Sequence, residues 1–142
     1  MKKRTPLRRH PELIPYSREH HQVLLTAQLL KTDVPNYRGM PDTPVGKRTY
    51  VQIFLAELLE PHMQREETEL FNRANTHPDL TEWINELRAD HAFFRQEIPA
   101  LNDLSDEDLV AAMNRLGQRL EQHVRLEERS FFQKYQMLFL KD

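Results

Sequence analysis

The sequence predicts an all-α protein, an up-down-up-down bundle of four helices. Apolar residues recur at spacings of three and four along four segments, which is the period of an amphipathic helix. The alternation of a β-strand is missing, and 3 glycines in 142 residues are too few for a turn-rich β domain. A chain of this length fits one domain, and its short connections favour antiparallel neighbouring helices.

The chain begins with a basic, proline-containing stretch, residues 1–16, that we expect to be an irregular arm packed across the bundle. The bundle itself is predicted over residues 17–142. Ser17 is the expected N-cap of its first helix, which runs to about Lys31. Prolines and a glycine then predict a loop over residues 33–42.

The second helix is expected to begin at Thr43, with Pro44 at the first helical position, and to run to about Asn75. Pro61 lies inside this helix and predicts a kink, because proline has no N–H to donate. We expect this helix to bury a face made of Val51, Leu55, Leu58, His62, Glu66 and Leu70.

The third helix is predicted from about Pro78 to Glu97, with Pro99 closing it. Ser105 and the acidic residues after it predict the start of the fourth helix, which reaches about Phe139. The buried face of the third helix is predicted as Leu80, Ile84, Leu87, His91, Phe94 and Ile98. That of the fourth is predicted as Leu109, Met113, Leu116, Leu120, His123, Glu127 and Phe131, and that of the first as His20, Leu24, Ala27 and Leu30.

Composition excludes several function classes. The chain has no cysteine, which removes disulfides, zinc fingers, iron–sulfur clusters and thiol nucleophiles. Its net charge of −2 argues against a nucleic-acid partner. We find no apolar run near the roughly 18 residues of a membrane span, and no secretory signal. We therefore expect no membrane association and a cytoplasmic location.

Every predicted helix places a histidine on its apolar face, and two helices add a glutamate one turn later. A buried polar group without a partner costs about 1–3 kcal/mol, so these residues need either one another or a bound metal. The pairs His62–Glu66 and His123–Glu127 are four residues apart, so both side chains of each pair leave the same helical face. Imidazole and carboxylate suit a hard or borderline divalent cation. The repeat of the pair at an offset of 61 residues predicts a pseudo-symmetric site for two ions.

The segments SREHHQVL, PHMQREETELF, ADHAFF and QHVRLEERSFF resemble those of the hemerythrin-like family, also called the HHE cation-binding domain. The resemblance covers roughly residues 17–135 and implies a non-haem centre of two iron ions with a bridging oxo or hydroxo group. The implied terminal ligands are His20, His62, His91 and His123, and the implied bridging ligands are Glu66 and Glu127. Ligand type alone also allows zinc or manganese.

The chain departs from the oxygen-carrying members of that family at two places. Arg95 stands where they have a second histidine on the third helix, and Glu127 follows His123 by four residues where they have an aspartate after a longer gap. The smaller histidine set implies an open or water-filled coordination position and argues against dedicated oxygen carriage. It looks more like the set of bacterial hemerythrin-like proteins, including the catalytic domain of iron–sulfur-cluster repair proteins. The rival ferritin-like class needs Glu-x-x-His pairs, and no glutamate of this chain has a histidine at that spacing.

Three functions are open at this stage. The first is a di-iron protein that binds or senses oxygen, nitric oxide, or redox or iron status. Its partner at the metals would be a small diatomic ligand or an anion, and a homodimer is allowed. The second is a di-iron enzyme or iron donor in the repair of oxidative or nitrosative damage, or in peroxide removal. The third is a metal-free bundle whose polar core recognises a partner.

Polar residues next to the six candidate ligands are interpreted as surface groups. We assign Glu67 and Glu128 to surface ion pairs with Arg65 or Arg129, the alternative being that they orient ligand histidines. His21 is assigned to the surface or to packing rather than to the site.

Overall fold

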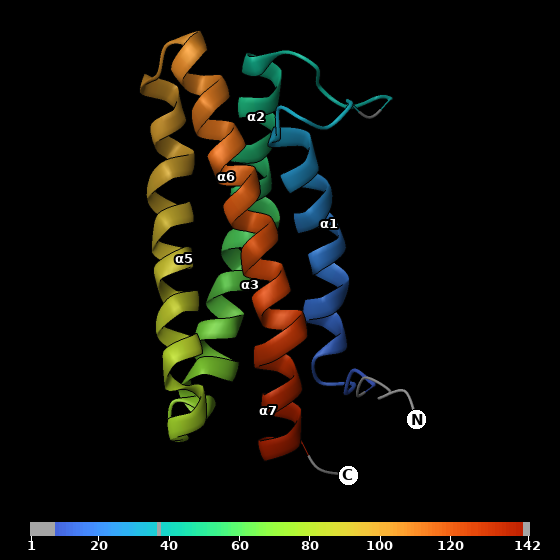
Figure 1. Cartoon of the computed structure of the whole chain (residues 1–142), viewed down its shortest axis with the longest axis vertical. Coiled ribbons are helices and arrows are strands. Elements are labelled where there is room, and N and C mark those ends of the chain that lie inside the picture. Colours follow the sequence, from blue (N-terminus) through green and yellow to red (C-terminus); the bar gives the residue numbers. More distant parts are fainter. Residues whose placement is uncertain (1–7, 37, 141–142) are drawn as a thin grey trace.

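Four long helical stretches run alternately up and down the molecule in the computed structural model, which describes residues 8–36 and 38–140 (Figure 1). The first helix, α1 (Ile14–Leu30), begins at the end of the bundle where the last helix, α7 (Phe132–Phe139), finishes. The predicted all-α four-helix bundle is confirmed, and no strand occurs in the described part of the chain. None of the helices described is both long and apolar enough to cross a membrane.

The predicted start of the first helix at Ser17 is wrong. The helix begins at Ile14, and Ser17 lies inside it. Burial explains the difference, because Leu13 and Tyr16 are buried in an apolar cluster and the helical turn before Ser17 brings them there. A hydrophobic anchor therefore decides the start of this helix rather than a polar cap.

The basic arm packs across the bundle in its described part, residues 8–13, as expected. The Arg9 guanidinium donates a hydrogen bond to Oε1 of Gln136 at 3.1 Å, which ties the arm to α7. Residues 14–16 belong to α1 rather than to the arm, so the predicted boundary is wrong by one turn of helix. The prediction for residues 1–7 lies outside the described residues.

The second stretch is continuous over residues 44–74 but changes helix type along its length. As predicted, Thr43 caps it by accepting a hydrogen bond from the Gly46 N–H at 3.0 Å, and Pro44 is its first residue. Its segments are α2 (Pro44–Phe54), the π-helix η1 (Leu55–Leu59), α3 (Glu60–Arg65), the π-helix η2 (Glu66–Phe71) and α4 (Asn72–Ala74).

The first π-helical segment changes which residues this stretch buries. In η1 a backbone N–H donates five residues back to the Leu55 carbonyl, directly before Pro61, so the widened turn accommodates the proline without ending the helix. The extra residue rotates the helix, and Phe54 and Leu59 point into the core. The predicted buried face is therefore wrong at Leu55 and Leu58, which are only half-buried.

The third stretch extends past its predicted end. Pro99 does not close it but lies inside its last turn, where the fixed φ of proline suits a helix and only one N–H is lost. The segments are the 3-10 turn η3 (Pro78–Leu80), the helix α5 (Thr81–Ala100) and the 3-10 turn η4 (Leu101–Asp103).

The fourth stretch begins and ends where the sequence predicts. Ser105 caps it by accepting a hydrogen bond from the Asp108 N–H at 3.3 Å. Its segments are α6 (Asp106–Leu126), the π-helix η5 (Glu127–Phe131) and α7. Two of the three π-helical segments thus begin at a predicted ligand, Glu66 in η2 and Glu127 in η5.

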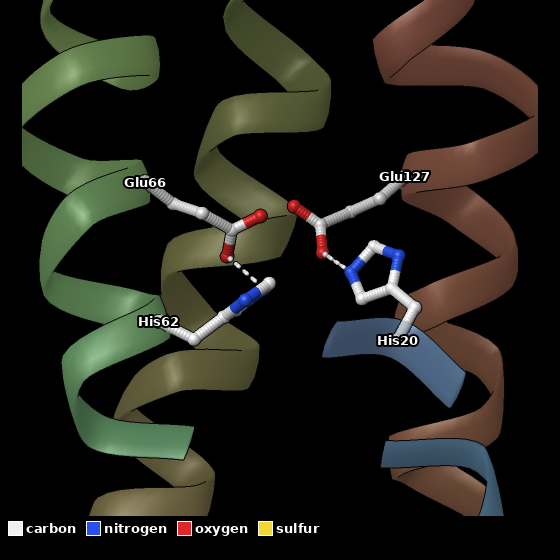
Figure 2. A group of neighbouring side chains, drawn as sticks. All are labelled: His20, His62, Glu66 and Glu127. Carbon is white, nitrogen blue, oxygen red and sulfur yellow. Dashed lines mark hydrogen bonds and ion pairs between the residues drawn. The ribbon is translucent and has the colours of Figure 1, made fainter. Parts of the chain in front are cut away.

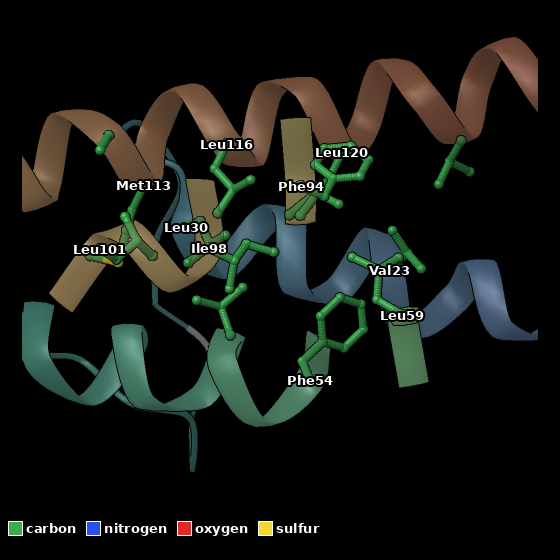
Figure 3. Packing of buried hydrophobic residues seen from close by; sticks show 14 of the residues in the cluster. Val23, Leu30, Phe54, Leu59, Phe94, Ile98, Leu101, Met113, Leu116 and Leu120 are labelled. Atoms are coloured by element: carbon green, nitrogen blue, oxygen red, sulfur yellow. The ribbon is translucent and has the colours of Figure 1, made fainter. Parts of the chain in front are cut away.

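Two apolar clusters fill the bundle, with a polar band between them along the helices. The first cluster, part of which Figure 3 shows, includes Val23, Leu59, Phe94 and Leu120. The second includes Tyr16, Leu70, Leu87 and Phe131. On each helical stretch a buried histidine separates members of the two clusters, as His91 separates Leu87 from Phe94. The polar band is therefore enclosed by hydrocarbon on both sides.

Candidate metal centre

The six predicted site residues come together in this polar band. Each is at most 3% exposed. Figure 2 shows Glu66 and Glu127 facing one another across the bundle, with His62 and His20 beside them. Within each of two groups, candidate ligand atoms lie no more than 4.8 Å apart. These groups are His20, His62, Glu66 and Glu127, and Glu66, His91 and His123.

Each glutamate contacts one histidine from each half of the bundle. Oε1 of Glu66 lies 3.4 Å from Nε2 of His62 and 3.2 Å from Nε2 of His91. Oε1 of Glu127 lies 3.1 Å from Nε2 of both His20 and His123. The two carboxylates therefore stand between a histidine pair on the first two stretches and a pair on the last two.

In each of the four site histidines, the other ring nitrogen, Nδ1, contacts a carboxylate from a different helical stretch. A carboxylate at Nδ1 fixes the tautomer that carries its proton there and leaves Nε2 with a lone pair directed at the band. The contacts are His20 to Glu128 at 2.6 Å, His62 to Glu19 at 3.0 Å, His91 to Glu67 at 2.7 Å and His123 to Asp90 at 2.8 Å.

These contacts correct the surface assignment of two carboxylates and identify two further carboxylates that orient a histidine. Glu67 and Glu128 are not merely surface ion-pair partners, because each reaches a buried imidazole. Glu19 and Asp90 are residues that sequence reasoning missed. A signal was present, because each is the acidic residue directly before a predicted ligand, His20 or His91. His21 is exposed, as expected.

Unpartnered polar atoms show that a cation fits this site. In the described part of the chain, seven buried side-chain nitrogen or oxygen atoms have no hydrogen-bond partner, and six of them belong to the polar band. Four of the six lie 3.1–3.4 Å from a nitrogen or oxygen of another site residue, but these contacts lack hydrogen-bond geometry. A buried polar atom left without a hydrogen bond costs about 1–3 kcal/mol. The six are Nε2 of His62, His91 and His123, both carboxylate oxygens of Glu66, and Oε2 of Glu127. Imidazole nitrogens and carboxylate oxygens are also the donors that divalent transition metals accept.

The titration properties of the site indicate the same need for positive charge. Burial alone lowers the pKa of His62, but the carboxylates of Glu66 and Glu19 raise it to about 10. Burial likewise opposes protonation of His123, whose pKa is raised to about 10 by Glu127 and Asp90. Burial raises the pKa of Glu127, but the contacts with His123, Glu66 and His20 together outweigh burial and hold that pKa well below the ordinary range. Without a metal, protons on His62 and His123 therefore supply positive charge next to the buried carboxylates.

An aromatic ring covers each imidazole, and the arrangement repeats between the two halves of the bundle. In the first and third stretches the contact is stacked: Phe132 on His20 and Phe71 on His91, at interplanar angles of 12° and 23°. In the second and fourth stretches the contact is edge-on: Tyr16 on His62 and Phe94 on His123. These rings fix the imidazoles and keep water from them.

A helical bundle with a buried cluster of imidazoles and carboxylates defines a class of cation-binding proteins. The model of one family in this class, described as the hemerythrin HHE cation binding domain, matches residues 16–135. The chain belongs to this family, as its sequence motifs predict. No curated protein and no solved structure matches the chain. Membership implies cation binding, and the donors described above are residues that could hold the cation.

Proposed function

We propose that this protein is a non-haem di-iron protein. His20 and His62 would bind one iron ion, His91 and His123 the other, and Glu66 and Glu127 would bridge them. The observation that carries the proposal is the set of six unpartnered buried atoms, all of them directed into one polar band. Contact of each glutamate with a histidine of either half supports the bridging role.

We further propose that the protein uses the bound iron to bind or sense oxygen or nitric oxide, or to sense redox or iron status. Two imidazoles and two shared carboxylates give each ion fewer donors than an octahedral ion accepts, which leaves room for an exogenous ligand. When bound, an iron pair supplies one-electron redox chemistry and open coordination positions. The residues of the chain orient the ligands through their Nδ1 contacts and exclude water with the aromatic rings.

Charge favours an anionic or electron-accepting ligand. Two ferrous ions beside two carboxylates leave a residual charge of about +2 in a region enclosed by apolar side chains. A bridging hydroxide or oxide, or an exogenous anion, would neutralise it. The same site would serve an enzyme or an iron donor, so turnover must be measured separately from binding.

Metal analysis of the protein as isolated, followed by anaerobic loading with Fe²⁺, tests the proposal. We expect two iron ions per chain and an absorption that changes on exposure to oxygen or nitric oxide. Peroxide consumption that continues above the background of free iron would favour the enzyme function instead. Transfer of iron to a chelator above the same background would favour the donor function. A wild-type protein that retains no metal after loading would overturn the proposal.

A further inference from the structure

Each orienting carboxylate of the candidate metal centre also contacts an arginine, and the pattern holds for all four histidines. Three of the arginines lie on the same helical stretch as the histidine of their set, and Arg9 lies on the arm that precedes α1, the helix of His20. The carboxylate of each set comes from another helical stretch. The sets are His20, Glu128 and Arg9; His62, Glu19 and Arg65; His91, Glu67 and Arg95; and His123, Asp90 and Arg119.

The four sets form a closed ring around the bundle. The histidine of the second stretch is held by a carboxylate from the first, that of the third by the second, and that of the fourth by the third. The ring closes because Glu128, on the fourth stretch, holds His20 of the first. In each set, the histidine and the arginine both contact a carboxylate from the preceding stretch around the ring, and in three of the sets they lie on one stretch themselves.

The contacts of Arg95 are the most extensive. Its Nη1 and Nη2 donate to Oε2 and Oε1 of Glu67 at 2.8 and 3.0 Å, a two-bond fork on the carboxylate that holds His91. The same guanidinium donates to both oxygens of Glu60 at 2.8–3.0 Å. Such a fork fixes the plane of a carboxylate as well as its position.

The set around His123 divides the carboxylate between its two partners. Nε of Arg119 donates to Oδ1 of Asp90 at 2.6 Å, and Nδ1 of His123 contacts Oδ2 at 2.8 Å. Arg119 and His123 therefore hold different oxygens of the same carboxylate, so the arginine fixes its orientation without competing for the oxygen that contacts the imidazole.

We infer that Arg9, Arg65, Arg95 and Arg119 are positioning residues for the metal centre, each fixing the carboxylate that orients one histidine. The inference rests on the proposed function. It assigns Arg95 a role outside the ligand set. Each of the four outer carboxylates thus has an arginine beside it, and Arg95 pairs with Glu60 as well.

Arg95→Gln and Arg119→Gln test the inference, with Arg125→Gln as a matched control. Arg125 pairs with Glu121 at 2.9 Å in a contact that does not involve a histidine, so the charge change is the same. Affinity for Fe²⁺ is measured anaerobically by competition with a chelator. The absorption spectrum of the Co²⁺-loaded protein reports ligand geometry, and thermal unfolding of the metal-free protein reports stability.

We expect both test variants to bind Fe²⁺ about 10–100-fold more weakly than the control, which is the usual effect of replacing a residue that orients a metal ligand. We also expect their Co²⁺ spectra to differ from that of the control. Arg95→Lys retains the charge without the fork, so we expect it to regain only part of the affinity. Metal-free stability should fall no further in the test variants than in the control.

Three results would overturn the inference. Wild-type affinity and an unchanged spectrum in both test variants would do so, as would an equal loss of affinity in Arg125→Gln. A lower unfolding temperature of the test variants with an unchanged Co²⁺ spectrum would mean that the arginines stabilise the fold but do not position the ligands. Failure of the wild-type protein itself to bind Fe²⁺ or Co²⁺ is a separate result, which removes the proposed function and the inference together.

Discussion

Replacing Glu66 with glutamine removes a charge that both halves of the candidate metal centre share. Glu66 is fully buried, belongs to both candidate ligand groups, and lies within 3.4 Å of an imidazole nitrogen on either side. Outer-ligand substitutions lower metal affinity about 10–100-fold. A residue that contacts both ions should exceed this range, so we expect a loss of at least about 100-fold, or about 2.7 kcal/mol.

The expected loss converts into a shift in thermal unfolding. At a free-metal concentration of about 100 times the wild-type Kd, each bound ion stabilises the protein by about 2.7 kcal/mol. For a chain of this size that is an increase in Tm of about 11 °C per ion, at about 4 °C per kcal/mol. With Kd raised about 100-fold, the same metal concentration adds only about 0.4 kcal/mol per ion, which is about 2 °C.

Differential scanning calorimetry of the metal-free and Fe²⁺-loaded proteins under anaerobic conditions measures this increase directly. Glu57→Gln is the matched control, because Glu57 is exposed on the same helical stretch and loses the same charge. We expect the control to retain the full metal-dependent increase. If Glu66→Gln retained it as well, the bridging role and the charge argument behind it would be refuted.

Three further predictions concern stability. In the metal-free protein the pKa values of His62 and His123 are raised from 6.5 to about 10, so the stability they contribute is complete below about pH 6.5 and lost as the pH rises through about 10. The free energy of unfolding, measured with urea, should therefore fall between pH 6.5 and 10. Binding of Fe²⁺ at pH 7 should release protons, which calorimetry in two buffers detects. A free energy that does not change with pH, together with no proton release, would contradict this. Gly117→Ala should lower the free energy of unfolding by about 1–2 kcal/mol, because the new Cβ would lie 2.7 Å from the carbonyl oxygen of Ala27. This overpacking exceeds the gain in helix propensity. An unchanged urea midpoint would show that α1 can move away from the new methyl group. Thr43→Ala should lower the free energy of unfolding by about 1 kcal/mol, because the helix cap is lost, and should leave the iron content unchanged. A changed iron stoichiometry would show that this remote cap affects the site.

Local sequence signals predict the helices well where a polar cap or an apolar period acts alone. Thr43 and Ser105 begin their helices as predicted because each side chain accepts a backbone hydrogen bond. Ser17 has the same chemistry but does not cap, because its hydroxyl donates to Glu128 on another stretch. Tertiary burial of Tyr16 then moves the helix start, and no local pattern contains that information.

The π-helical turns show a second limit of sequence reasoning. A regular period assigns Leu55 and Leu58 to the core, but the extra residue in η1 turns Phe54 and Leu59 inward instead. Pro61 predicts a kink from the sequence, but it does not specify that the helix answers with a widened turn and a rotated face. An expectation built on a constant 3.6-residue period therefore fails at this segment.

The candidate site was predictable as a set of residues but not as a network. The six inward-facing residues follow from helical spacing, and the structure brings them together; that they bind two iron ions stays a prediction. The outer carboxylates do not follow in the same way, since the sequence favours the surface for Glu67 and Glu128 and gives no role to Glu19 and Asp90, whereas each of the four contacts a site histidine. Each of them contacts a histidine on another stretch, so its role depends on how the helices are rotated against one another.

The sequence by itself determined the helical bundle, the family, and the presence of polar groups on faces that must be buried. These are properties of spacing along one helix, where the backbone hydrogen bonds fix which residues share a face. Only the tertiary structure decided which carboxylate holds which imidazole and how the arginines close the ring. Those contacts join residues as far apart in sequence as His20 and Glu128, and their geometry comes from the packing of whole helices, to which each local segment contributes only a part.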